Sequence, residues 1–145
     1  MSVPVPTAGY RYGHIISGKL EFSDRAAAIA NPATGLHLAD VPVASPEQLE
    51  RTISSARKAF PGWSSKSYEE RANVLLDIAG IIEAGVDGYK KLLTAEQGKP
   101  YQDAFIELMG SVHWFRETAK LRLPEVIHQD TAERRVVTQQ VPLGV

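Results

Sequence analysis

The chain has 145 residues, of which 43% are hydrophobic, and carries 16 basic against 17 acidic residues. This length fits one domain with a packed core, and the balanced charge lacks the basic surface typical of nucleic-acid binders. No cationic leader precedes an apolar run, and no window of about 18 apolar residues occurs. We therefore expect a cytoplasmic protein that neither enters a membrane nor binds nucleic acid. The chain has no cysteine, so it cannot form a disulfide or supply a thiolate.

The first forty-odd residues predict short strands joined by turns. Ser17-Gly18 suits a tight turn between the strand-like runs "YGHII" and "KLEF". Asn31-Pro32 and Thr34-Gly35 supply turn chemistry before a second apolar run that ends near Val43. Two strand-turn-strand units are therefore expected here.

A helix is expected to begin at Ser45. Ser45 can cap it, Pro46 suits its first position, and Gln48 completes a capping box. Four apolar residues then recur at helical spacing, and Pro61-Gly62 is expected to end the helix; the four are Leu49, Ile53, Ala56 and Phe60.

Ser67 and Glu70 form a second capping box, which predicts another helix up to Gly85. Its apolar stripe consists of Ala72, Leu75, Ile78, Ala79 and Ile82. Because the connection between the two helices is short, we expect them to form a helical hairpin.

Two further helices are expected around Gly98, which suits a left-handed position at a helix end, with the last helix beginning at Pro100. The apolar stripe of that helix consists of Phe105, Leu108, Val112, Phe115 and Ala119. Trp114 is expected to pack in the core. Beyond Pro124, "RRVVTQQV" predicts an isolated strand.

The residue pattern by itself shows no catalytic constellation. The four histidines lie in different elements, and none has a second histidine at the spacing of a helical metal site; they are His14, His37, His113 and His128. Gly98-Lys99 lacks the Gly-rich loop of a phosphate cradle, so a helix break explains it. The carboxylates of Glu69, Glu70, Asp103 and Glu107 are explained by polar helix faces.

Three segments closely resemble the N-terminal part of the aldehyde dehydrogenase superfamily: "NPATGLHLADVPVASPEQLERTISSARKAFPGWSSKSYEERANVLLDIAGIIE", "LLTAEQGKP" and "RRVVTQQVPLGV". The shared features are Asn31-Pro32 with Gly35, Ala59-Phe60 with Trp63, Arg71, Gly98-Lys99-Pro100, and the final Pro142 to Val145. Their order matches from about residue 14 to the end. "LLTAEQGKP" is similar to the succinate semialdehyde dehydrogenase branch.

The resemblance implies an α/β family of which this chain is an incomplete, mostly helical N-terminal portion. Short strands would precede about four helices and a late strand. Residues 1–125 would be the N-terminal part of the dinucleotide-binding domain, and residues 126–141 strand material of the oligomerisation flap. Residues 142–145 would begin the return into the cofactor domain.

The resemblance also implies NAD(P)-dependent oxidation of aldehydes to carboxylates in the full-length family. The cysteine nucleophile, glutamate general base and oxyanion asparagine of that family have no counterpart here. We therefore expect this chain alone to be inactive as a dehydrogenase and to bind neither NAD nor NADP well. Glu107 and the backbone at Ala30 would be candidate ligands of a monovalent cation.

Three interpretations follow. The chain is part of an ordinary aldehyde dehydrogenase, or it is a stand-alone remnant that associates with itself or with a full-length relative through residues 134–141. In the third interpretation, the chain has a different activity in a pocket between its helices, although no residue pattern in the sequence indicates one. Helices that lose the sheet they cover leave apolar side chains in water, which favours self-association.

Overall fold

The computed structural model describes residues 11–144 of the chain. Short strands come first and four helices follow, as the sequence predicts, and the chain then forms a strand pair where the residue pattern predicted one isolated strand. The strands are β1 (His14–Ile16), β2 (Lys19–Glu21), β3 (Ala26–Ala30), β4 (His37–Pro42), β5 (Val126–Asp130) and β6 (Arg135–Thr138), and the helices are α1 (Pro46–Ser64), α2 (Tyr68–Ala84), α3 (Val86–Gln97) and α4 (Tyr101–Lys120).

The strands form three separate antiparallel pairs, β1–β2, β3–β4 and β5–β6. At the first turn, Ser17 and Gly18 both have positive φ, 53° and 75°, which is the backbone of a tight hairpin turn. At the second turn, Asn31 Oδ1 accepts a hydrogen bond from the Ala33 amide at 2.9 Å. The two strand-turn-strand units predicted from the sequence are therefore confirmed.

The start of α1 follows its predicted capping box, because Ser45 Oγ accepts from the Gln48 amide and Gln48 Oε1 accepts from the Ser45 amide. Its predicted end at Pro61-Gly62 is wrong, since the helix continues to Ser64. Pro61 cannot donate a hydrogen bond, but its carbonyl accepts from the Ser65 amide at 3.2 Å. One lost bond in the last turn is insufficient to end the helix there.

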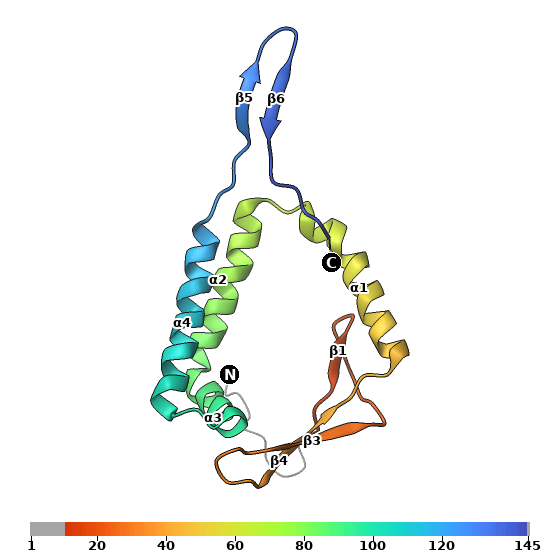
Figure 1. The fold of residues 1–145 in the computed structure, drawn as a ribbon, viewed down its shortest axis with the longest axis vertical. Coiled ribbons are helices and arrows are strands. Elements are labelled where there is room, and N and C mark those ends of the chain that lie inside the picture. Colours follow the sequence, from red (N-terminus) through yellow and green to blue (C-terminus); the bar gives the residue numbers. More distant parts are fainter. Residues whose placement is uncertain (1–10, 145) are drawn as a thin grey trace.

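The start of α2 follows the second capping box, with Ser67 and Glu70 each accepting from the other's amide. The predicted helical hairpin of α1 and α2 is wrong. Figure 1 shows the two helices diverging from their short connection, and α2 lies along α4 instead, while α1 contacts β1. Proximity in the sequence therefore did not decide which helix α2 pairs with.

The helix break at Gly98 is confirmed, because Gly98 has φ of 72° and its amide donates to the Thr94 carbonyl at 2.8 Å. A Cβ added at Gly98 would lie 2.9 Å from Pro32 Cγ. The β3–β4 turn therefore lies against the α3–α4 junction. Pro100 is the N-cap of α4, one residue before the helix itself begins.

The core of the helix pair consists mainly of small residues that let α2 and α4 approach closely. Ala79 and Ala104 are completely buried and Val112 is 1% exposed. The predicted α2 stripe faces this interface, and Leu108, Val112, Phe115 and Ala119 of the α4 stripe are also buried or half-buried.

Two predicted core residues of α4 lie outside this core. Trp114 is 70% exposed, so its predicted packing is wrong; it lies on the face of α4 that is turned away from α2, where no described segment covers it. Phe105 is 36% exposed and lies at the margin of the stripe.

The late strand is not isolated, because β6 pairs with β5 in an antiparallel hairpin. Figure 1 shows this hairpin projecting from the end of the helix pair. All residues of β5 are exposed, and Val136 and Val137 of β6 are half-buried. The residue pattern alone missed β5 because its residues, "VIHQD", hardly alternate between apolar and polar, whereas the family resemblance placed residues 126–141 in strand material.

Candidate functional sites

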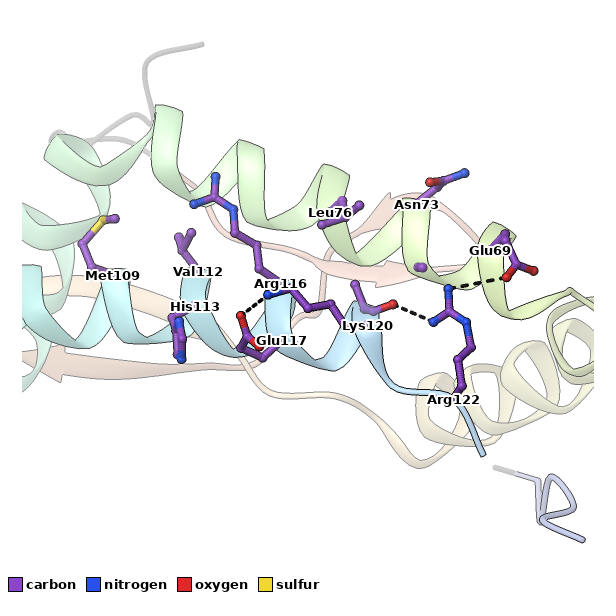
Figure 2. Close-up of a pocket in the computed structure, with 12 residues that line it drawn as sticks. Glu69, Asn73, Leu76, Met109, Val112, His113, Arg116, Glu117, Lys120 and Arg122 are labelled. Carbon is purple, nitrogen blue, oxygen red and sulfur yellow. Dashed lines mark hydrogen bonds and ion pairs between the residues drawn. The ribbon is translucent and has the colours of Figure 1, made fainter. Parts of the chain in front are cut away.

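One candidate site is a groove of about 580 Å³ between α2 and α4 (Figure 2). Its apolar lining comes from the helix interface, including Leu76 on α2 and Met109 and Val112 on α4. Polar side chains surround this lining: Glu69, Asn73, His113, Arg116, Glu117, Lys120 and Arg122. The α4 stripe predicted an apolar face that needs a partner, but no local pattern indicated the groove, because Glu69 and Arg122 are 53 positions apart in the chain.

Each cation of the groove has an anionic partner within the chain. Arg116 pairs with Glu83 at 2.6 Å, and Lys120 pairs with Glu117 at 2.6 Å. The guanidinium of Arg122 lies 3.5 Å from Glu69 Oε1. The hydrogen bond from Lys120 lowers the pKa of Glu117, and the positive charge of Lys120 acts in the same direction. The groove is therefore electrostatically balanced.

A second polar site lies where β2 meets the start of α1. Gln48 is 8% exposed, and its Oε1 accepts from Ser23 Oγ at 2.7 Å while its Nε2 donates to the Phe22 carbonyl at 3.1 Å. Ser23 Oγ also lies 3.0 Å from His14 Nε2. Since Ser23 uses its proton toward Gln48, it accepts from His14, so its oxygen is not activated as a nucleophile. The network connects the β1–β2 hairpin to α1, a role of Gln48 that the capping box alone does not reveal.

The two candidate cation ligands lie on different elements. Ala30 is the last residue of β3, next to a shift in the β3–β4 register. Glu107 lies on α4, where its carboxylate forms an ion pair with Lys99. The Gly98–Pro32 contact brings the two segments toward each other, but the residues between 11 and 144 include no group of three or more His, Asp or Glu side chains suited to a metal ion.

The remaining carboxylates singled out in the sequence have structural environments. Glu70 caps α2, and its hydrogen bonds with Ser67 lower its pKa. Glu69 lies by Arg122, and Asp103 is exposed in the first turn of α4. No pair of them comes together as a general acid and base within the described part of the chain. In that part, no helix is both long and apolar enough to cross a bilayer.

Comparison with known sequences gives a consistent family. Residues 20–145 match the Aldehyde dehydrogenase family. The chain is 42% identical over 117 residues to a probable aldehyde dehydrogenase of Pseudomonas sp, covering 81% of this chain and 24% of that protein. It is 38% identical over 121 residues to a 3-sulfolactaldehyde dehydrogenase of Pseudomonas putida, covering 81% and 25%.

A solved structure agrees with the sequence matches. The succinate-semialdehyde dehydrogenase of Burkholderia pseudomallei is 29% identical and superposes with a TM-score of 0.81, covering 88% of this chain and 27% of that one. The chain thus spans about a quarter of the length of the relatives that it matches. The order of strands and helices and the matched sequence agree over most of its length, and the chain belongs to the aldehyde dehydrogenase family.

Proposed function

We propose that this chain is the N-terminal part of an NAD(P)-dependent enzyme that oxidises an aldehyde to a carboxylate. The observation that carries the proposal is the collinear family match from residue 20 onward. It is supported by the superposition of the same elements on a succinate-semialdehyde dehydrogenase. Under this proposal, residues 1–125 belong to the dinucleotide-binding domain, residues 126–141 form its flap, and residues 142–145 return toward the cofactor domain.

The chemistry belongs to a longer assembly than these 145 residues. A thiolate must add to the aldehyde carbon, so that hydride can leave the resulting thiohemiacetal for the nicotinamide. This chain has no cysteine to supply the thiolate. Its contribution would be to help form the cofactor domain and to hold the flap, with NAD or NADP bound only by the longer assembly.

Glu107 and the Ala30 backbone are, under the same proposal, the ligands that this chain offers to a monovalent cation. The ion pair with Lys99 already neutralises Glu107, so a cation would have to displace the lysine ammonium. Replacing Lys99 by Met should then increase the affinity for K⁺ measured by titration. Equal affinity in the two proteins would remove Glu107 from the ligand set.

Reading the coding region beyond codon 145 tests the proposed function directly. We expect it to continue into a segment with a cysteine, and the longer product to form NAD(P)H with aldehydes while residues 1–145 alone form none. NAD(P)H formation by the purified 145-residue chain would contradict the chemical argument. A stop codon directly after Val145, with a stable product in cells, would contradict the assignment to a longer enzyme.

The exposed β5–β6 hairpin favours a second candidate, an interaction module that pairs with another copy or with a full-length relative. Its two strands pair with each other in the described chain, and their outer edges carry backbone groups available to another strand. Sedimentation of the purified chain tests this candidate. A monomer at all concentrations, with no complex formed with a full-length relative, would contradict it.

A further inference from the structure

The connection between α4 and the β5–β6 hairpin is bound by a side chain of α2. The Tyr68 hydroxyl donates a hydrogen bond to the Leu123 carbonyl at 2.9 Å. Leu123 lies between the C-cap of α4, Leu121, and the first residue of β5, Val126. The first residue of one helix therefore binds the backbone that leaves the other.

Two guanidinium groups surround the Tyr68 ring. Arg71 lies 4.9 Å and Arg122 lies 5.7 Å from the ring centroid, within the range of cation–π attraction. Arg71 is itself held by a hydrogen bond to the Lys66 carbonyl. Tyr68, Arg71, Arg122 and Leu123 are called the Tyr68 cluster below.

Arg122 connects the Tyr68 cluster to the end of α4. Its Nη1 donates to the carbonyls of Ala119 at 2.9 Å and Leu121 at 2.8 Å, groups that have no partner within the helix. Its Nη2 lies 3.5 Å from Glu69 on α2. Figure 2 shows Arg122 reaching back to both helices from the connection.

The direction of the β5–β6 hairpin depends on contacts with its connecting segment, because the hairpin itself does not pack against a helix or another sheet among the described residues. β5 and β6 pack on each other and have no comparable contact with a helix among the described residues. Figure 1 shows the segment from α4 to β5 as extended chain, and the segment after β6 runs back toward α1. With no sheet or helix beneath it, the angle of the hairpin is set where its connections are bound.

We propose that the Tyr68 cluster fixes the direction in which the β5–β6 hairpin leaves the α2–α4 pair, so that the hairpin is presented in one orientation. The orientation itself does not depend on what the hairpin binds. Its use, to lower the entropic cost of association, rests on the proposed oligomerisation role of the flap.

Spin labels can measure this orientation because the chain has no native cysteine. Labels attached through Asp77→Cys on α2 and Glu133→Cys in the β5–β6 turn report the distance from helix to hairpin, with labelled protein diluted into unlabelled chain. Tyr68→Phe removes the hydroxyl but keeps the ring. Loss of one hydrogen bond should raise the fraction of molecules outside the main distance peak by roughly two- to tenfold.

Tyr89→Phe is the matched control, since Tyr89 lies on α3 and its hydroxyl forms no hydrogen bond among the described residues. Arg122→Gln is a second variant with the Tyr68 hydroxyl intact and should also broaden the distribution, whereas Arg116→Gln, also in the groove, should not. Circular dichroism checks that each variant keeps its helix content. Distributions as narrow as the wild-type one in both Tyr68→Phe and Arg122→Gln would overturn the proposal.

Sedimentation of the same samples separates this inference from the proposed function. A monomeric wild type whose distances broaden in Tyr68→Phe supports the orienting role and contradicts the oligomerisation role. An oligomer whose distances are unchanged by either variant supports oligomerisation and overturns the orienting role.

Discussion

At the scale of single residues, a few side chains determine where the elements begin and how they meet. Ser45 and Gln48 start α1, Ser67 and Glu70 start α2, and Gly98 ends α3. Gln48 and Gly98 also act at a distance, because each contacts a segment from another part of the chain. Substitutions at these positions therefore test both a local and a tertiary contact.

The capping carboxylate of α2 should make helix content depend on pH. The hydrogen bonds to Ser67 lower the pKa of Glu70 below its usual 4.5 in the folded chain. The stabilisation is therefore fully present above pH 4.5 and is lost as the pH falls through the lowered pKa. Acid titration followed by circular dichroism should show less loss of helix for Glu70→Gln than for the wild type over that range. Parallel titration curves would contradict this role of Glu70.

Replacing Gly98 by alanine should destabilise the chain more than the same change at Gly35. Both glycines have positive φ, 72° and 70°, so both variants incur backbone strain of about 1–2 kcal/mol. A Cβ at Gly98 also lies 2.9 Å from Pro32 Cγ, whereas one at Gly35 has open space. Urea unfolding gives the two free energies of unfolding. Equal losses in the free energy of unfolding would mean that the β3–β4 turn moves away from residue 98 without a loss of stability.

At the scale of elements, the close approach of α2 and α4 depends on alanines at their interface. Ala79 on α2 and Ala104 on α4 are completely buried. This approach also shapes the groove, whose apolar lining comes from the margins of the same interface. Packing of α2 against α4, rather than against its sequence neighbour α1, thus forms this groove.

A larger side chain at Ala79 should separate the two helices. We expect Ala79→Leu to lower the free energy of unfolding by about 1–3 kcal/mol, because the buried position has no room for it. Ala84→Leu is the matched control at an exposed position of the same helix, where the change should stay within about 0.5 kcal/mol. Urea titration measures both. A loss for Ala79→Leu no larger than for the control would show that the interface adapts.

At the scale of the whole molecule, large apolar side chains lie exposed on several separate elements of the fold. Trp114 on α4 is 70% exposed, Ile81 on α2 62%, Ile127 on β5 52%, and Leu143 95%. Exposed apolar surfaces of this kind are typical of sites that bind another protein or another segment of the same protein. The family match fits this picture, since the chain spans about a quarter of its relatives.

Charge on the hairpin should reduce self-association if the flap is the contact. We expect Ile127→Lys to lower the oligomer fraction in sedimentation, because a lysine on an edge strand opposes pairing between chains. Ile81→Lys places the same charge at a similarly exposed position on α2 and should have a smaller effect. Equal effects would mean that association is driven by general apolar exposure rather than by the hairpin.

The sequence by itself determined the local structure and the family. Capping boxes, turn residues and helical spacing are interactions between residues a few positions apart, so they could be read directly for Ser45, Ser67 and Ser17-Gly18. The predicted end of α1 was wrong because one proline in the last turn removes only one hydrogen bond. The residue pattern missed β5 because that segment lacks period-two alternation, and only the family resemblance placed it in strand material.

Only the tertiary structure decided which surfaces meet. The pairing of α2 with α4, the exposure of Trp114, the groove and the Tyr68 cluster all join residues far apart in the chain, and no local pattern records such contacts. An apolar stripe predicts that one face of a helix packs against another element, but it does not indicate which element that is. For this chain, the residues determine the family. The exposed apolar faces of the helices and the exposed β5–β6 hairpin indicate the surfaces at which a partner would bind.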